Sequence, residues 1–300
     1  MERQQVLLVD AFADRPTGGR QVAVLPNNSA TASQRAAVGS ELQTSGVVTY
    51  DDGELEYTDC DGSQAVISGA VAGYAALSNR GLIVPSEHDF HVAGESVDAA
   101  DPFPVELTED GHVTVSLPAT TVRELDTESA DLADALGVDR ATLQDVGADL
   151  PAARTDTFGG TVLVPINFLQ HLSAASPDYR AIVDILGAED ASRLVAYTFD
   201  TLESHTDVHA RVFDPTAPRN ERPASGVAGA ACAAHVGSYE AFDGERAEIA
   251  IESGRFAGRP STMRATVSTD AQVTGGALTV LDASLAVPAD EGTDDDIIEV

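Results

Sequence analysis

The chain has 300 residues, 43 % of them hydrophobic, which is enough to form the cores of two domains of ordinary size. Its 49 acidic residues outnumber its 17 basic residues, giving a formal net charge of -32, and the sequence contains arginine but no lysine. A charge of this sign repels the phosphates of nucleic acids and of anionic membranes, so both are excluded as expected partners.

The first half of the chain alternates short apolar runs with two helical patterns. Its predicted strands are Val6–Val9, Val22–Leu25, the hairpin pair Val47–Tyr50 and Glu54–Thr58, and His112–Leu117. Helices are predicted at Ser33–Leu42, which a hydroxyl residue caps, and at about Ser68–Ser78, which is rich in small residues. Residues 92–110 are rich in Asp, Gly and Pro and predict a surface connection.

The second half begins with an acidic stretch, Thr127–Pro151, which contains a short amphipathic helix at Ser129–Leu136 and is predicted to bridge the two halves. The strands predicted after it are Thr161–Pro165, Leu194–Phe199, Arg211–Phe213, Ala247–Ile251, Met263–Val267 and Ala277–Val287. Two further helices are predicted at Tyr179–Leu186 and at about Ser225–Phe242. The acidic tail after the last strand is expected to fray.

Two helix starts, one in each half, are similar in sequence. Ser68-Gly69-Ala70-Val71-Ala72-Gly73 and Ser225-Gly226-Val227-Ala228-Gly229 each begin an Ala-rich helix, which favours a duplicated architecture. A helix start presents unpaired N–H groups and a partial positive charge, so two of them facing across a cleft could bind a small carboxylate, with Gly69 and Gly226 allowing close approach. Alternatively, serine is an ordinary N-cap and glycine only permits tight packing.

Four segments carry a family resemblance: Val9-Asp10-Ala11-Phe12-Ala13-Asp14-Arg15-Pro16-Thr17-Gly18-Gly19, Val208-His209-Ala210-Arg211-Val212-Phe213-Asp214-Pro215, Glu221-Arg222-Pro223-Ala224-Ser225-Gly226 and Gly258-Arg259-Pro260-Ser261. With them the chain resembles the PhzF-like family, named for phenazine biosynthesis. The resemblance implies the α+β fold of diaminopimelate epimerase: two similar lobes, each a curved, mostly antiparallel sheet wrapped around a central helix, with the active site between them. It also implies cofactor-independent isomerisation or epimerisation of a small amino- or hydroxy-carboxylate.

From this resemblance we expect an N-terminal lobe over residues 1–118, to which residues 283–300 return, and a C-terminal lobe over residues 119–282. The family also implies a homodimer.

The sequence departs from the family at the positions that carry its chemistry. The family's Asn-Leu-Ser-Glu-Thr, whose glutamate shuttles the proton, corresponds to Glu41-Leu42-Gln43-Thr44-Ser45, which places Thr44 at that glutamate. The family's Cys-Gly-His becomes Ser68-Gly69-Ala70, and the aspartate of its Glu-Asp-Pro-Ala-Thr-Gly-Ser becomes Arg222. A threonine without an activating base cannot shuttle a proton and an arginine stays protonated, so these positions cannot supply the family's mechanism.

Candidate site residues follow from the same segments. The candidate catalytic residues are Glu221, Thr44 and Glu41, with Glu221 or Glu41 as the base, and the candidate substrate-binding residues are Ser68, Gly69, Arg222, Ser225 and Gly226. Arg222 would hold a carboxylate through a bidentate contact or, alternatively, offset the acidic surface around it.

Other readings stay open. Asp59, Cys60 and Asp61 lie just before the first helix start and could replace a lost catalytic group, although solvation at the surface is the alternative for each carboxylate. A competing hypothesis is a binding module that senses or sequesters a metabolite or scaffolds a partner. A third is an enzyme of different chemistry on the same lobes, which a fold alone does not exclude.

No cofactor or metal is expected. Cys60 and Cys232 form no CxxC or Cys/His spacing, and His205 and His209 would not share a helical face. No glycine-rich phosphate-binding motif is present. The N-terminus has no signal-like segment and no apolar run is long enough to span a bilayer, so we expect a cytoplasmic chain with reduced thiols.

The density of carboxylates predicts adaptation to a salt-rich cytoplasm. At ~1 M salt the Debye length is only ~3 Å, so repulsion between surface carboxylates is largely screened. We expect cooperative unfolding in molar salt and loss of the fold in dilute buffer, measured as the melting temperature against salt concentration. A melting temperature that does not change with salt would contradict this.

Overall fold

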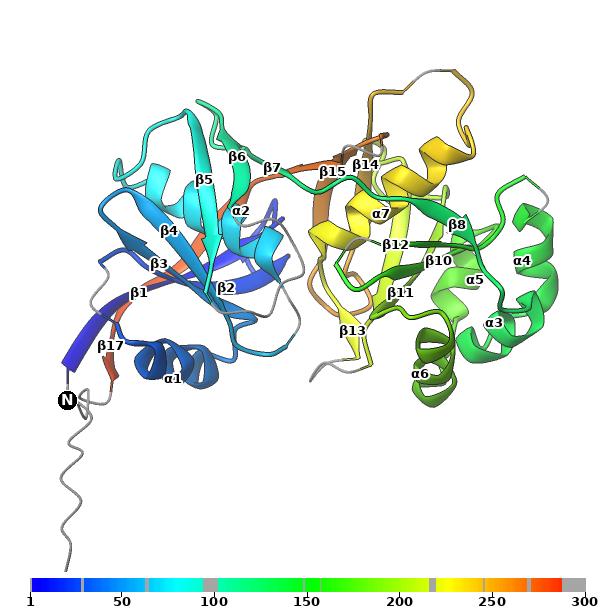
Figure 1. Cartoon of the computed structure of the whole chain (residues 1–300), viewed down its shortest axis with the longest axis horizontal. Helices are drawn as coiled ribbons and strands as arrows, with labels where there is room; N and C mark the ends of the chain where they lie inside the picture. The colour runs from blue at the N-terminus through cyan, green and yellow to red at the C-terminus, as the bar shows by residue number, and fades with distance from the viewer. Residues whose placement is uncertain are drawn as a thin grey trace, which may run out of the picture.

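The computed structural model describes residues 2–27, 30–62, 65–93, 102–147, 149–156, 158–215, 220–244, 246–268 and 271–287. It confirms the expected α+β class: two lobes lie side by side, each with a curved sheet and a central helix (Figure 1). In the part of the chain described, no helix is both long and apolar enough to cross a membrane.

The N-terminal lobe wraps eight strands around one helix. In order of pairing the strands are β17 (Ala277–Val287), β1 (Glu2–Ala11), β2 (Arg20–Leu25), β3 (Gly46–Asp51), β4 (Glu54–Asp59), β5 (Glu87–Val92), β6 (Phe103–Leu107) and β7 (Val113–Ser116). Only the β2–β3 and β4–β5 pairs are parallel. Helix α2 (Val66–Ser78) fills the curve, and α1 (Ala32–Leu42) lies outside it (Figure 1).

The C-terminal lobe repeats this plan. Its strands, in order of pairing, are β8 (Val122–Glu124), β9 (Ala153–Thr155), β10 (Thr161–Pro165), β11 (Arg193–Thr198), β12 (Val208–Phe213), β14 (Glu248–Ser253), β15 (Ser261–Thr266) and β16 (Gln272–Gly275), with the short β13 (Glu221–Arg222) paired to β12. Helix α7 (Gly226–Ser238) is central, and the outer helices are α3 (Ser129–Leu136), α4 (Arg140–Gly147), α5 (Leu169–Ala174) and α6 (Tyr179–Ala188).

Small residues let both central helices sit close to their sheets. Almost every residue of α2 is buried, and a Cβ atom on Gly73 would lie 2.6 Å from the Leu55 side chain. In α7 a Cβ on Gly229 would lie 2.6 Å from the sulfur of Met263. A helix that is apolar on all sides is buried on all sides, which is why neither helix shows an amphipathic pattern.

The chain crosses between the lobes twice. The first crossing follows β7, which also pairs with β16 of the other lobe. The second crossing precedes β17, which pairs with β1 from Ala277 onward, while the expected lobe boundaries at residues 118 and 283 stay predictions. Residues 288–300 of the expected returning segment lie outside the described residues.

The predicted surface connection over residues 92–110 contains a strand. Its residues 94–101 lie outside the described part, but β6 follows at Phe103–Leu107, where buried and exposed side chains alternate. This alternation is the pattern of a strand with one face on the core, and the neighbouring Asp and Pro residues obscured it in the sequence.

His235 of α7 is a fully buried histidine with both ring nitrogens bonded. Nδ1 accepts from the Tyr197 hydroxyl at 2.9 Å, and Nε2 lies 3.0 Å from the Pro151 carbonyl oxygen, to which it donates. Burial lowers the pKa of His235 to about 4, against 6.5 for an ordinary histidine. The folded protein therefore holds this side chain neutral.

This histidine should make stability depend on pH. Above pH ~6.5 His235 is neutral in both the folded and the unfolded protein. Between pH ~6.5 and the folded pKa of about 4, only the unfolded protein binds a proton at this residue. Across this window the free energy of unfolding therefore falls by about 3 kcal/mol. His235→Gln keeps a donor and an acceptor but cannot titrate. The difference between the unfolding free energies of the two proteins, measured by denaturant titration in molar salt, should change across this window. A constant difference would contradict the assignment.

Candidate functional site

A pocket of about 280 Å³ lies where the two lobes meet. The N-terminal lobe contributes the first residues of β2, the end of α1 and the segments flanking β3 and β4, and the C-terminal lobe contributes β13 and the loop between β14 and β15. The lining residues are Arg20, Gln21, Gly39, Ser40, Gln43, Thr44, Ser45, Cys60, Asp61, Arg222, Pro223 and Arg259. Three arginines thus face one small space.

Arg222 reaches this pocket because of its register in β13. It pairs with Val212, and its guanidinium lies between carboxylates of both lobes: Nη1 is 3.1 Å from Asp61, while Nε and Nη2 are 3.4 and 3.3 Å from Asp214. Its side chain is only 6 % exposed. The arginine is therefore held rigidly, with one edge turned toward the N-terminal lobe.

Arg20 approaches the same point from the N-terminal lobe. Its Nε donates to the Ser45 hydroxyl at 2.8 Å, its Nη1 to the Ala224 carbonyl at 3.2 Å, and its Nη2 lies 3.9 Å from Asp61. Burial lowers the pKa of Arg20, and repulsion by Arg222 lowers it further, although an arginine still carries its charge at neutral pH. The pocket wall is thus electropositive inside a strongly acidic protein.

Arg259 connects the first and the last of the sequence segments singled out above. It donates to the Gly18 and Gly19 carbonyls at 2.6 and 2.8 Å and to the Asp10 carboxylate at 2.5 Å. Gly18 is required here, since a Cβ atom on it would lie 2.5 Å from the carbonyl oxygen of Pro260. These contacts hold the loop after β14 against the loop after β1 and fix one side of the pocket.

The remaining polar groups of the pocket differ in their chemistry. Thr44 is 3 % exposed, and its hydroxyl has no hydrogen-bond partner among the described residues. Burial, with help from Asp59 and Asp61, raises the pKa of the Cys60 thiol to about 11, so it stays protonated at neutral pH. Asp61 is the carboxylate that lines the pocket.

Two predicted catalytic residues lie elsewhere. Glu221 precedes Arg222 in β13, so its side chain points to the opposite face of the strand, where both carboxylate oxygens accept from Arg211 at 3.0 and 2.8 Å. Glu41 is exposed in the last turn of α1 and does not line the pocket. Of the three predicted catalytic residues, the structure places Thr44 in the pocket, together with the predicted ligand-binding Arg222.

The two helix starts converge, but an isoleucine fills the space between them. Helix α2 begins at Val66, so Ser68 and Gly69 lie within its first turn, and a Cβ atom on Gly69 would lie 2.4 Å from the Tyr57 ring. Gly226 approaches Ile67, with 2.5 Å between a Cβ built on it and Ile67 Cγ2. The expected ligand space between these glycines is therefore packed, and the open pocket lies beside it.

Ser225 has the structural role that its residue type favours. It is the N-cap of α7, and its hydroxyl accepts from the Ala228 N–H at 3.2 Å. Neither Ser225 nor Ser68 lines the arginine pocket. Sequence reasoning did not assign Arg20 or Arg259 to the site, and it named Asp61 only as a possible replacement for a lost catalytic group. Arg259 stands in a segment compared with the family, but nothing local in the sequence shows that these three residues meet.

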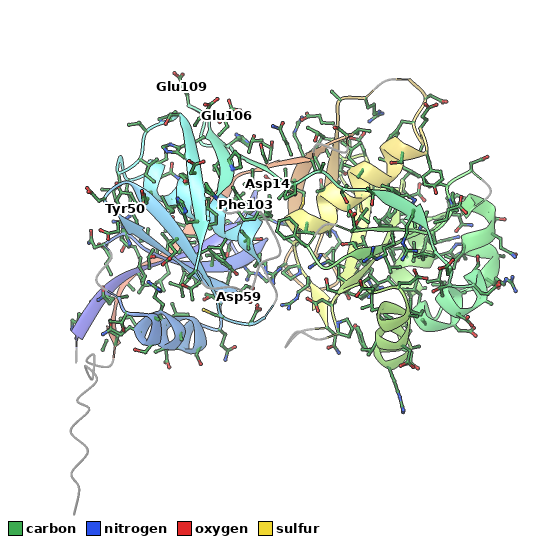
Figure 2. The ribbon with its side chains drawn as sticks, viewed as in Figure 1. Asp14, Tyr50, Asp59, Phe103, Glu106 and Glu109 are labelled. Atoms are coloured by element: carbon green, nitrogen blue, oxygen red, sulfur yellow. The ribbon has the colours of Figure 1, made fainter. Side chains whose placement is uncertain are left out.

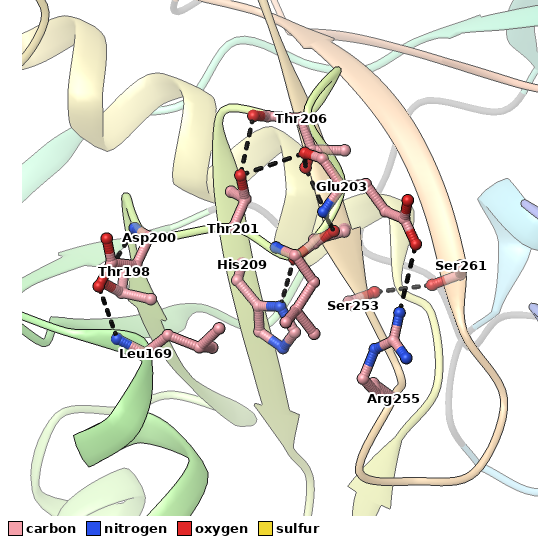
Figure 3. Close-up of polar contacts among 12 residues, drawn as sticks. Leu169, Thr198, Asp200, Thr201, Glu203, Thr206, His209, Ser253, Arg255 and Ser261 are labelled. Atoms are coloured by element: carbon pink, nitrogen blue, oxygen red, sulfur yellow. Dashed lines mark hydrogen bonds and ion pairs between the residues drawn. The ribbon is translucent and has the colours of Figure 1, made fainter.

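A second polar cluster, which includes Glu203, Thr206 and His209 (Figure 3), surrounds Glu252 near the end of β14. Glu252 accepts from the Leu202 and Glu203 N–H groups at 2.7 and 3.0 Å, and one of its oxygens lies 2.6 Å from His209 Nδ1. Burial would raise the pKa of Glu252, but these bonds outweigh it and lower the pKa. The cluster anchors the turn before β12, and among the described residues no group of three or more His, Cys, Asp or Glu side chains could hold a metal ion.

Comparison with known proteins agrees with this architecture. The chain superposes on a PhzF-family phenazine biosynthesis protein from Bacillus anthracis with a TM-score of 0.80 at 19 % identity, covering 95 % of this chain and 100 % of the other. A predicted epimerase from Pseudomonas aeruginosa superposes with a TM-score of 0.72 at 18 % identity, with the same coverage of each chain. The molecule thus has the two-lobed fold of PhzF-family proteins.

Sequence comparison gives the family itself. The PhzC-PhzF family, described as phenazine biosynthesis-like protein, matches residues 103–283. The chain is also 25 % identical over 270 residues to the uncharacterized isomerase YfhB of Bacillus subtilis (strain 168), covering 86 % of this chain and 89 % of that protein. The chain belongs to the PhzC-PhzF family.

Because the two helix starts are in contact, we expect any side chain at position 226 to lower the stability of the fold. Gly226→Ala would force its Cβ into Ile67 and should destabilise the protein by about 1–3 kcal/mol, because neither helix start can move without disturbing the other lobe. Gly187→Ala is the matched control, since a Cβ there meets nothing within 4 Å in helix α6. It should leave stability equal or higher by up to ~1 kcal/mol. Denaturant unfolding of both variants tests this, and equal stabilities would contradict it.

Proposed function

We propose that the arginine pocket binds a small amino- or hydroxy-carboxylate and that the protein isomerises or epimerises it without a cofactor. The observation that carries the proposal is the convergence of Arg20, Arg222 and Arg259 on one small pocket between the lobes. Guanidinium groups match the geometry of a carboxylate and form hydrogen bonds about twice as strong as neutral ones. The relative from Bacillus subtilis, named an isomerase, supports the reaction class.

Selection of a carboxylate follows from the local charge. The protein as a whole has a formal net charge of -32 and repels anions at long range. In the salt-rich solution that we propose for this protein, however, charges more than a few ångströms apart are screened, so contacts inside the pocket decide what binds. Buried guanidinium groups there favour an anion small enough for a space of about 280 Å³.

Proton transfer requires a group that can accept and return a proton near neutral pH. Thr44 lacks a neighbouring base, and the pKa of about 11 leaves Cys60 protonated. Asp61 is the remaining candidate among the described lining residues, since its carboxylate lies beside the arginines that would hold the ligand. We assign it the role of proton carrier in place of Glu221 and Glu41.

A second candidate function is binding without turnover. It is favoured by one observation: the Asp61 carboxylate is already engaged in an ion pair with Arg222 at 3.1 Å. In that case the protein would sequester or sense the metabolite. The two functions differ in whether bound ligand exchanges a carbon-bound proton with solvent.

Proton NMR in heavy water and molar salt tests both steps, with L-lactate and L-alanine as probes. Arg222→Gln removes the charged contact and should weaken binding about 10- to 100-fold, whereas Arg222→Lys should retain part of it. Isomerase function predicts loss of the Cα–H signal of a bound probe over time. Binding with no exchange would favour the second function.

The controls separate these outcomes from misfolding. Both Arg222 variants should unfold cooperatively in the same salt, because Lys or Gln can still meet Asp214. If wild-type protein binds neither probe, or binds one equally well after Arg222→Gln, the carboxylate site proposed here is wrong.

A further inference from the structure

Asp61 occupies the edge of Arg222 that a ligand carboxylate would need. Of the three nitrogens of that guanidinium, Nε and Nη2 contact Asp214 within the C-terminal lobe, and only Nη1 faces the N-terminal lobe. Asp61 Oδ2 lies 3.1 Å from this Nη1 and 3.9 Å from Nη2 of Arg20. One carboxylate oxygen thus sits between two arginines from different lobes.

The positions of the two aspartates indicate different roles. Asp214 lies just after β12 in the lobe of Arg222 and has a side chain only 10 % exposed, whereas the Asp61 side chain is 17 % exposed and lines the pocket. Asp61 follows β4, whose last residue, Asp59, lies at the end of the strand on the side of the second lobe (Figure 2). We therefore treat Asp214 as the constant partner of Arg222, whereas Asp61 contacts Arg222 on the side that faces the pocket.

We propose that Asp61 is an internal substitute for the ligand carboxylate, which displaces it from Arg222 and Arg20 on binding. The inference rests on the proposed carboxylate site. In the free protein Asp61 neutralises the two guanidinium groups and joins the lobes. A ligand carboxylate takes over both contacts, and Asp61, released from its ion pairs with the two arginines, stays beside the ligand and can accept a proton.

The competition has a defined effect on affinity. When a side chain of the protein occupies the ligand site, only the fraction of molecules with an open site can bind the ligand. The apparent affinity falls in proportion to that fraction. We expect removal of the Asp61 charge to tighten ligand binding about threefold to tenfold, which corresponds to ~0.7–1.4 kcal/mol of competition for the two guanidinium groups. Proton exchange should respond in the opposite direction, because the same substitution removes the proposed base. Tighter binding combined with lost exchange is a result that a purely structural role would not produce.

The test compares Asp61→Asn with Asp59→Asn in molar salt, with L-lactate and L-alanine titrated by saturation-transfer NMR and exchange followed in heavy water. Asp59 lies two residues earlier, bonds the Tyr57 hydroxyl at 3.2 Å and does not line the pocket, so its substitution removes the same charge from the same segment. We expect Asp61→Asn to bind the probe about threefold to tenfold more tightly than wild type and to show no exchange, and Asp59→Asn to match wild type in both. Asp61→Ser should repeat the Asp61→Asn result.

Other outcomes overturn specific parts of the inference. Equal tightening by Asp59→Asn would mean a general effect of charge and no displacement. Unchanged or weaker binding by Asp61→Asn, with binding that still requires Arg222, would overturn the displacement and leave the proposed function standing. Exchange that persists in Asp61→Asn would remove Asp61 as the base. Absence of Arg222-dependent binding in both wild type and Asp61→Asn would overturn the proposed function itself.

Discussion

The site depends on the ion pairs of the Arg222 guanidinium, because this group binds one carboxylate from each lobe. Asp214 holds Arg222 from within the C-terminal lobe, and Asp61 contacts Arg222 from the N-terminal lobe. Removing one member of a buried ion-pair network leaves the others uncompensated, which typically costs ~3–5 kcal/mol. The spacing of the lobes, the charge of the pocket and the position of Asp61 are therefore coupled through one side chain.

The molecule combines two opposite electrostatic environments. Glu106 and Glu109 are exposed at the outer edge of the first lobe (Figure 2), while Arg20, Arg193 and Arg222 are each about 5 % exposed or less. Burial, opposed by Asp214 but aided by repulsion from Arg20 and Arg222, lowers the pKa of Arg193 to about 10. Two of these buried arginines, Arg20 and Arg222, line the pocket of a chain whose formal net charge is -32.

The sequence predicts local structure well and long-range contacts poorly. The hydroxyl cap of α1, found at Thr31, and the bounds of α3 follow from local patterns, as do most strands. The site depends on contacts between residues that are distant in sequence. The sequence allows Glu221 as a base, but the register of β13 turns its side chain toward Arg211. The space between the helix starts is filled by Ile67, which contacts Gly226 far away in the sequence. Motif comparison located Thr44 and Arg222, but only the fold shows that Arg20, Asp61 and Arg259 join them.

In our proposal the residues at positions 44 and 222 act together. A glutamate at position 44 would stand in the same pocket as three arginines and would compete with the ligand carboxylate for them. The threonine found there carries no charge and does not compete. What remains is Asp61, whose place at Arg222 a ligand carboxylate can take because it offers the guanidinium group the same charge. In our proposal the carboxylate that the reaction needs has moved from the segment before β3 to the segment after β4, and the charge of the ligand itself makes it available.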